Sequence, residues 1–419
     1  MKRPFPRFLL TASLLLSVSF PVFSGTPARQ GVLAEVPAGP VFLSGAAPGH
    51  TFDAPVSAAA GIAFNAAGSD VSAPQPDTIR GSAPRSVSGP TQQAGRETLS
   101  KGKAPVFTVQ LHGTVRAKFE YQPDLGKSRF EVRNARFSLS GSVTPLVNYK
   151  AEIDLSDEGV IKMLDAYARL NLLQRKLRFT IGQMRVPFTI DAHRSPHEQY
   201  FANRSFIAKQ AGNVRDVGAT LGWTFGRKVP VTLEGGLFNG SGLTDQKDYW
   251  TRSFNYSAKA QVQVAERINF SVSIQKIRPD LVDIRMYDAG AYYENRLWHV
   301  EAEYLRKNYA GDAFAGVNVV DAFVCRNVPL KGRAIRQISI LARYDYMSDH
   351  STGIPDPATG RLVADDPERH RVTGGLTFSL GLPFRADIRL NYEAYFYRAD
   401  ATPALSEQDK IVAEVMVRF

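Results

Sequence analysis

The feature that most constrains the fold of this chain is a strict alternation of apolar and polar residues, which recurs in separate stretches from Pro105 to the end. In the stretch "VFTVQLHGTVRAKFEY", apolar or small side chains take every second position from Phe107 to Phe119, and mostly polar ones stand between them. The stretch "VNYKAEIDL" at 147–155 follows the same rule. Because successive side chains of a strand point to opposite faces, the pattern predicts long β-strands with one apolar and one polar face.

Strand length and loop spacing favour a membrane barrel over a soluble sandwich. The alternating stretches run for about ten residues or more, whereas strands of globular proteins favour roughly five or six. Ten residues at about 3.3 Å each, tilted by roughly 40°, rise about 25 Å, which matches the apolar band of an outer-membrane barrel. Short turns also alternate with long connections, which is typical of such barrels. The long connections are expected at 185–215, 239–254, 306–318, 347–369 and 398–410.

The predicted fold is therefore all-β, a transmembrane antiparallel β-barrel of about 16 strands. The strands are expected to begin near residues 105, 128, 147, 161, 177, 216, 231, 255, 268, 286, 297, 319, 335, 370, 386 and 411. An even number of strands places both ends on the periplasmic side, and the last strand must pair with the first because an open edge in lipid leaves backbone groups without partners. Phe419 is then expected on the lipid face of the closing strand.

The first 104 residues differ in texture from the rest. Residues 1–24, with three basic residues before an apolar stretch, are read as a secretory signal peptide. Residues 25–104 are mostly Ala, Gly, Ser and Pro, which predicts a flexible tail before the porin-like barrel domain at 105–419. A partner-binding or wall-associating role of the tail stays open. The single cysteine, Cys325, means that an exported chain of this size has no internal disulfide.

Several short stretches of the sequence resemble one family of outer-membrane channels. They are "RNARFSLSGSV", "YKAEIDLSDEGV", "DAYARL", "IGQMRVPF", "FANRS", "RDVG" and "LARYDYMSD", in this order along 105–419. Together they resemble the phosphate-selective porin O and P family. The resemblance implies a homotrimeric, sixteen-stranded porin in the outer membrane of a Gram-negative cell. Where family members often carry a basic residue before "PFG", this chain has Arg185 and then "VPFT".

The resemblance also gives the terminal residue a role. The position of Phe419 resembles the final aromatic residue by which the outer-membrane assembly machinery recognises its clients. The net charge of +11 is modest for 419 residues and does not predict a nucleic-acid partner. The expected partners are outer-membrane lipid, further copies of the chain, the assembly machinery, and small anions or polar solutes.

The connection at 185–215 is the candidate constriction, because a long loop folded into a barrel narrows it and concentrates counter-ions. Its basic residues outnumber Asp191 and Glu198, and Arg offers planar, paired donors to oxyanions. The alternative is a solvated external loop. The five candidates for the pore constriction are Arg185, Arg194, Arg204, Lys209 and Arg215.

Alternation places a second set of basic residues on the lumen wall. Acidic residues at least as numerous fall on the same face, so the sequence predicts passive diffusion of small polar solutes with at most a weak anion or phosphate preference. Segregated opposite charges, which give a transverse field, are the alternative arrangement. The lumen-wall candidates are Arg116, Lys118, Arg136, Lys150, Arg169 and Arg178.

No pattern in the chain indicates an enzyme, a cofactor or a metal site. The stretch "DAHRSPHE" holds an Asp, two His and a Ser, but a catalytic triad needs residues brought together in space rather than strung along one loop. An outer-membrane lipase would need about twelve strands and a Ser–His pair on the outer surface, which alternation does not offer. The remaining alternative is a structural or adhesive outer-membrane barrel whose N-terminal tail is its interaction segment.

Overall fold

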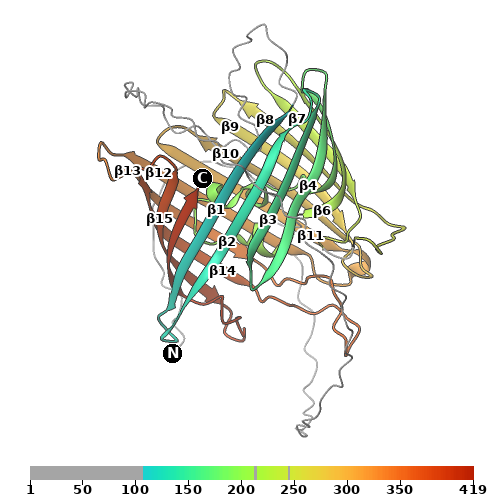
Figure 1. Cartoon of the computed structure of the whole chain (residues 1–419). Coiled ribbons are helices and arrows are strands. Elements are labelled where there is room, and N and C mark those ends of the chain that lie inside the picture. The colour runs from blue at the N-terminus through green and yellow to red at the C-terminus, as the bar shows by residue number, and fades with distance from the viewer. Residues whose placement is uncertain (1–106, 212–214, 244–245) are drawn as a thin grey trace, which may run out of the picture. The chain divides into compact units, whose positions relative to one another are not determined.

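The computed structural model describes residues 107–211, 215–243 and 246–419. The predicted signal peptide at 1–24 and the predicted tail at 25–104 therefore lie outside the described residues. The remainder forms a tilted β-barrel (Figure 1). None of the helices in this described part is long and apolar enough to cross a membrane.

The described chain forms sixteen antiparallel strands, each paired with the next, and β16 pairs back with β1 to close the ring. They are β1 Thr108–Gln122, β2 Lys127–Ser142, β3 Val147–Asp157, β4 Val160–Leu172, β5 Leu177–Arg185, β6 Arg215–Phe225, β7 Val231–Phe238, β8 Asn255–Val264, β9 Ile268–Ile277, β10 Ile284–Glu294, β11 Trp298–Tyr309, β12 Val317–Pro329, β13 Ile335–Met347, β14 Arg369–Leu380, β15 Arg385–Tyr397 and β16 Lys410–Arg418. The predicted fold is confirmed, and most strands begin at the predicted residue or one residue away.

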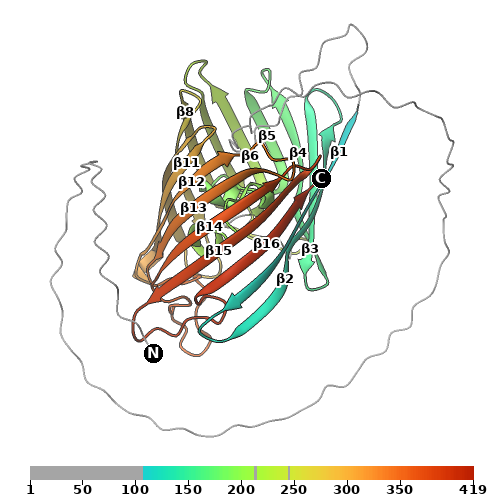
Figure 2. The same cartoon turned by 90° about the vertical axis from the view of Figure 1, so that its left-hand side faces the viewer.

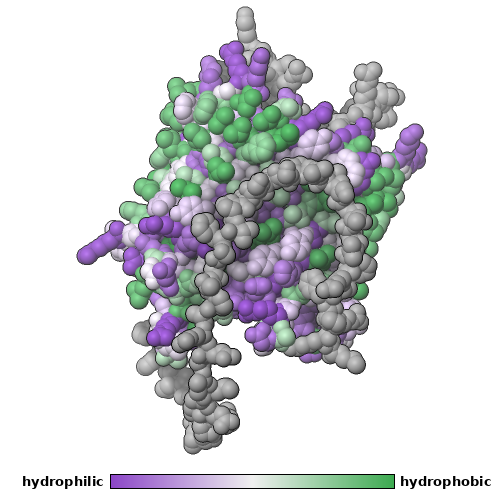
Figure 3. All heavy atoms as spheres, turned by 180° about the vertical axis from the view of Figure 1, so that it is seen from behind, coloured by the Kyte–Doolittle hydropathy of each residue, from purple (hydrophilic) through white to green (hydrophobic). Residues whose placement is uncertain are grey.

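The apolar face of each strand points outward, as the alternation predicts. Leu111, Ile181, Phe270 and Ile340 are among the apolar side chains exposed on this outer surface. Exposed large apolar residues on a soluble protein would be a liability, but on a barrel they meet acyl chains. Figure 3 shows part of this outer surface, where hydrophobic side chains gather.

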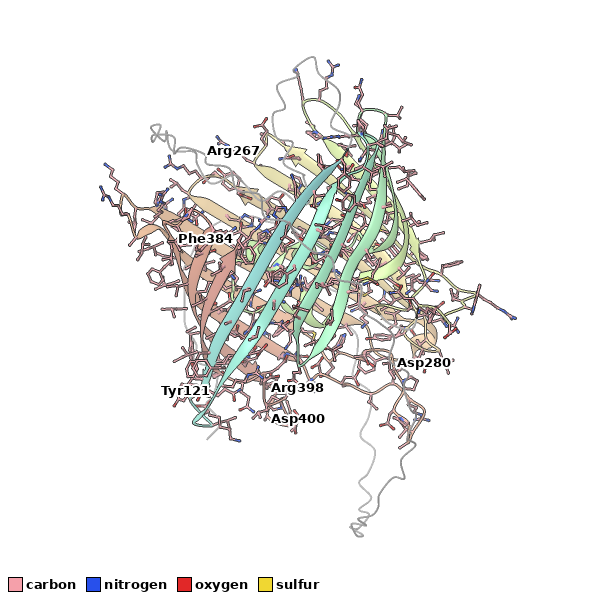
Figure 4. The ribbon with its side chains drawn as sticks, in the orientation of Figure 1. Tyr121, Arg267, Asp280, Phe384, Arg398 and Asp400 are labelled. Atoms are coloured by element: carbon pink, nitrogen blue, oxygen red, sulfur yellow. The ribbon has the colours of Figure 1, made fainter. Side chains whose placement is uncertain are left out.

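The division of the barrel into an end with short turns and an end with long loops is less regular than predicted. Tight turns join the strands at the end where Arg267 and Phe384 lie, and the opposite end carries Tyr121, Asp280, Arg398 and Asp400 (Figure 4). Long connections are present at this opposite end, but three of its loops are short, between β1 and β2, β3 and β4, and β9 and β10. The β1–β2 and β3–β4 hairpins turn tightly because Gly126 and Gly159 adopt positive φ angles of 58° and 92°.

The lumen near the end with the long connections holds an apolar core that alternation alone does not predict. Side chains from the β5–β6 connection, including Phe188, Phe206 and Ile207, are fully buried against inward residues of β10–β13 such as Met286 and Leu305. The barrel is thus partly filled on one side. Any passage for solute must run through the remaining part of the lumen.

The last residue closes the barrel seam. Phe419 exchanges two backbone hydrogen bonds with Gly113 of β1, at 2.8 Å and 3.1 Å. Its ring lies over Gly113, where an added Cβ would come within 2.3 Å of a ring carbon, and it meets the Phe137 ring edge-on at 6.2 Å. The outward position predicted for Phe419 is thus the one observed, with 56% of the residue exposed.

We expect Gly113→Val to weaken barrel closure, because the new side chain displaces the Phe419 ring. Forced repacking of this kind costs about 1–3 kcal/mol. The measurement is the temperature at which the folded band is lost in heat-modifiable gel migration. The matched control is Gly374→Ala on the outer face of β14, where an added Cβ meets nothing within 4 Å. Equal melting of the two variants would contradict the packing role of Gly113.

Candidate pore constriction

The connection between β5 and β6 lies inside the barrel. It contains two short 3₁₀ helices, η1 Asp191–His193 and η2 Pro196–Glu198, and one π-helical turn, η3 Ile207–Ala211. Figure 2 shows these green segments between the walls of the barrel. We call residues 186–211 the inner loop.

The inward course of the inner loop starts where β5 leaves its neighbour. Pairing of β4 with β5 ends at Ala166 and Gln183, whereas pairing of β5 with β6 continues to Arg185 and Arg215. Gly182 lies at this divergence with φ of 126°, and a Cβ there would come within 2.2 Å of the Ala166 carbonyl oxygen. Only glycine fits this close approach in such a conformation. The ends of β5 and β6 therefore turn into the lumen and carry the inner loop with them.

One end of the inner loop is bound to an acidic stretch of wall on β10 and β11. Glu301 of β11 pairs with both terminal nitrogens of Arg194, one of them at 2.8 Å. The carboxylate of Glu303 accepts backbone N–H bonds from Ile190 and Asp191. Glu301 and Glu303 are each only 2% exposed. The inner loop therefore covers these acids and supplies their partners, as buried carboxylates require.

A later part of the inner loop is held by arginines of β1, β13 and β14. Arg116 of β1 donates to the carbonyl of Ala202 at 2.6 Å. The next two carbonyls, of Asn203 and Arg204, accept from Arg343 of β13 at 3.0 Å and from Arg371 of β14 at 2.7 Å. Three successive backbone oxygens are thus bound by guanidinium groups from three strands, which fixes the loop across the lumen.

Each of these wall arginines also has an acidic partner on the wall. Arg116 pairs with Glu414 at 2.6 Å. Arg343 and Arg371 share Asp345, at 2.8 Å and 2.9 Å. These cations therefore hold structure together, and their charge is largely matched by neighbours.

Within the inner loop, Asp191 is the central acceptor. It accepts from Arg194 at 3.2 Å and from the Ser205 hydroxyl at 2.7 Å. Burial raises the pKa of Asp191, but Arg194 and Arg204 more than offset this, so its pKa lies below the usual range. Burial also lowers the pKa of Arg194, yet Glu301 and Asp191 raise it well above its usual value. The loop is therefore pinned by an ionised cluster.

The five predicted constriction residues do not form one group. Arg194 and Arg204 come together, because a terminal nitrogen of Arg204 donates to the Arg194 carbonyl at 3.1 Å. Arg185 donates to the backbone carbonyl of His193, which belongs to the inner loop. Lys209 instead reaches Glu407 of the β15–β16 loop at 2.6 Å, and Arg215 faces Asp165 of β4 at 2.8 Å. Their role in selectivity stays a prediction.

The predicted lumen-wall residues divide into two sets. Arg116 and Lys118 contact the inner loop, through Ala202 and through the Asn203 side chain at 3.1 Å. The remaining ones lie on β2–β5, away from the acidic wall that the loop covers. Arg136, Lys150, Arg169 and Arg178 form this second set, which we call the basic ladder.

In the ion pairs of the basic ladder, the cations are more exposed than the acids. Lys150 pairs with Glu152 at 2.9 Å and with Asp165 at 2.6 Å, but its side chain is 24% exposed while theirs are 10% and 3% exposed. Arg136 pairs with Asp154 at 2.8 Å and is likewise the more exposed partner. Solute in this part of the lumen therefore meets ammonium and guanidinium groups before carboxylates.

The free part of the lumen opens into a cavity of about 860 Å³. Its lining combines cations of the wall and the inner loop, among them Lys118, Arg204 and Lys410, with acids such as Glu120. We call this cavity the vestibule.

Sequence reasoning missed which residues hold the inner loop. Alternation assigned Glu301, Glu303 and Asp345 to the lumen, but it gave no sign that a loop would cover them. Asn203, which contacts Glu393, was marked only by the motif "FANRS", and Gln199, which contacts Arg116, had no sequence signal. Burial lowers the pKa of His197 to about 2, so this histidine stays neutral at physiological pH. Among the described residues there is no group of three or more candidate metal ligands.

Comparison with known sequences gives one family. The sequence profile described as phosphate-selective porin O and P matches residues 108–313. A comparison with curated proteins finds no match.

Comparison with solved structures gives distant relatives of the fold. An anion-selective porin from Comamonas acidovorans matches with a TM-score of 0.53 and 11% identity, covering 74% of this chain and 99% of its own. The outer-membrane channel DcaP of Acinetobacter baumannii has a TM-score of 0.52 and 13% identity, covering 75% and 97%. The trimer form of OmpT from Vibrio cholerae has a TM-score of 0.51 and 10% identity, covering 75% and 100%. At these identities the likeness concerns the barrel fold.

We expect Glu301→Gln to loosen the inner loop, because it leaves the buried Arg194 without its bidentate partner. Breaking a buried pair in this way costs about 3–5 kcal/mol. One measurement is the temperature of thermal unfolding. The other is the single-channel current, of which both the mean and the noise are recorded. Removing both charges, with Arg194→Met added, should recover part of the stability, since no buried charge is then unpaired. The control is Glu234→Gln on β7; an equal effect there would contradict the clamp.

Proposed function

Since residues 108–313 place this chain in the phosphate-selective porin O and P family and its barrel is closed, it is an outer-membrane channel, and we propose that it passes small polar solutes with a preference for anions. The observation that carries the proposal is the uneven distribution of accessible charge in the lumen. Glu301 and Glu303 of β11 are covered by the inner loop, while the basic ladder faces the free lumen.

The distribution of accessible charge leads to a different expectation for selectivity than the number of charges along the strands does. Counted along the strands, acids are at least as numerous as cations, which favours little selectivity. The buried acids, however, are neutralised by Arg194 and by backbone donors at short range. An ion in the pore responds to the charges that it can approach, and in a low-dielectric wall a few accessible cations raise the local anion concentration.

The finer parts of the proposal concern assembly and export. We propose a homotrimer, supported by the trimer form of OmpT among the structures with a similar fold. Phe419 is proposed as the assembly signal, supported by its place on the outer face at the closing seam. Export through the predicted signal peptide and the absence of enzymatic activity belong to the same proposal.

We expect Lys150→Gln to reduce anion preference, because it removes the most exposed cation of its ion-paired cluster and leaves Glu152 and Asp165 with the more buried Arg215 as a partner. The measurement is the reversal potential across a salt gradient in a planar bilayer. The shift should be toward cation permeability, by several millivolts or more. Arg306→Gln, the same charge change on the outer face of β11, is the control and should leave the potential unchanged.

Two outcomes would count against the proposal. An unchanged reversal potential in Lys150→Gln would reject the basic ladder as the selective element. A folded barrel that is silent in the bilayer would favour the structural or adhesive alternative over a channel.

A further inference from the structure

The outward face of β9–β12 carries positive charge and no negative charge. Alternation and side-chain exposure place the apolar and aromatic residues of these strands outside, as on the rest of the barrel. Within these four strands, none of the outward positions holds Asp or Glu. The basic residues at their outward positions are Lys276, Arg285, Arg306 and Arg326. Because a charge on the lipid face is costly at mid-membrane, such residues mark where polar headgroups begin.

These basic residues lie at two levels, near opposite ends of the strands. Arg326 of β12 is directly opposite Trp298 of β11, and its guanidinium carbon lies 4.6 Å from the centre of the indole ring. At the other level, Arg285 of β10 is directly opposite Asn308 of β11. From Trp298 to Asn308 the strand advances about ten residues, which at about 3.3 Å each and a tilt of roughly 40° gives about 25 Å. This is the height of the apolar band, so the two levels lie at the two membrane boundaries.

The level of Arg285 belongs to the outer leaflet. It lies next to the β9–β10 loop, which carries Asp280. Figure 4 shows Asp280 at the end with the long connections and Arg267 at the opposite end. Long connections of outer-membrane barrels face the outside of the cell. The headgroups that this level meets are therefore those of outer-leaflet lipids.

Arg306 is held by neutral groups and reaches toward this boundary. Its Nε donates to the side-chain oxygen of Asn308 and its Nη1 to that of Asn318, each at 2.9 Å. Its Nη2 lies over Gly316, in the connection before β12, where an added Cβ would come within 2.1 Å of it. Amide oxygens orient a guanidinium group but do not neutralise it, and no ion pair joins Arg306 to an acid in the described part of the chain. The side chain thus carries its full charge to the headgroup level.

Arg285 supplies a second cation beside the first. Arg285 is opposite Asn308, and Tyr287, two positions along the same strand, is opposite Arg306. Diagonal neighbours of an antiparallel pair lie about 7–8 Å apart, which two long side chains can span. Arg285 is exposed, and among the described residues no hydrogen bond or ion pair binds its guanidinium group. Both arginines can therefore reach one ligand.

The third basic residue at this level already has partners. Lys276 is 6% exposed and donates to the Ser253 hydroxyl at 2.6 Å, and a carboxylate oxygen of Asp283 lies 3.3 Å from its Nζ. The same carboxylate oxygen lies 3.8 Å from Arg278. Asp283 is thus shared by two other cations, and it leaves Arg285 and Arg306 available.

Two guanidinium groups at the headgroup level fit a phosphate group. Each offers planar, paired N–H donors, and a phosphate presents several negatively charged acceptor oxygens. Arg306 is already oriented by its two amide acceptors, which lowers the entropy cost of binding. The surface next to the arginines is apolar and aromatic, with Tyr287 and Tyr304 exposed, and it meets acyl chains. The ligand that satisfies both parts carries a phosphate and acyl chains together.

We propose that Arg285 and Arg306 bind the phosphate group of an outer-leaflet lipid at the outer end of β10–β12. The site lies on the lipid face of the barrel and does not open into the pore. It is therefore independent of the proposed anion preference, and it gives this side of the barrel a bound lipid at a fixed position.

The test is native mass spectrometry of the full chain in detergent, titrated with lipid A, an acylated glucosamine disaccharide that carries two phosphates. We expect the double variant Arg285→Gln, Arg306→Gln to bind it about tenfold or more weakly than the unsubstituted chain, because two cations are lost. The matched control is Arg326→Gln, the same charge change on the same face at the other boundary, which should bind as the unsubstituted chain does. Arg285→Gln alone removes an exposed side chain and should weaken binding about threefold or more, which keeps the test valid where the double variant fails to fold.

Three results would overturn the inference. The first is equal binding of lipid A by the unsubstituted chain and the arginine variants. The second is an equal loss in Arg326→Gln, which would indicate a general attraction between charges. The third is displacement of lipid A by an about tenfold excess of inorganic phosphate, which would indicate an anion site without a lipid. The reversal potential of the double variant should equal that of the unsubstituted chain, so the lipid site and the channel function are judged by separate measurements.

Discussion

The structure depends on one constraint, the need to pair every backbone group that meets lipid. A strand in acyl chains has no solvent to bond, so the sheet must close on itself. Here closure is made by β1 and β16, and the backbone bonds between Gly113 and Phe419 extend it to the last residue.

Inside the ring a second requirement operates, because buried charges need partners. The inner loop meets it by placing Arg194 on Glu301 and backbone amides on Glu303. The consequence is electrostatic as well as structural. The charged groups that hold the inner loop are buried, so a passing ion cannot approach them. The accessible charge that remains comes mainly from the basic ladder around Lys150.

The sequence predicted the barrel well and the lumen less well. Period-two alternation located the sixteen strands and their outward faces, because it reports a local property of each residue. It also identified the long connection after β5. It did not predict the apolar core around Phe206, the covering of Glu301, or the separate position of Lys209, since these arise from contacts between residues that are far apart in the sequence.

The grip of Arg116, Arg343 and Arg371 on the inner loop has an evolutionary consequence. These guanidinium groups bind the carbonyl oxygens of residues 202, 203 and 204 rather than their side chains. A carbonyl is present whatever amino acid occupies the position. Substitutions along this segment can therefore change what the pore admits while the path of the loop across the lumen stays the same.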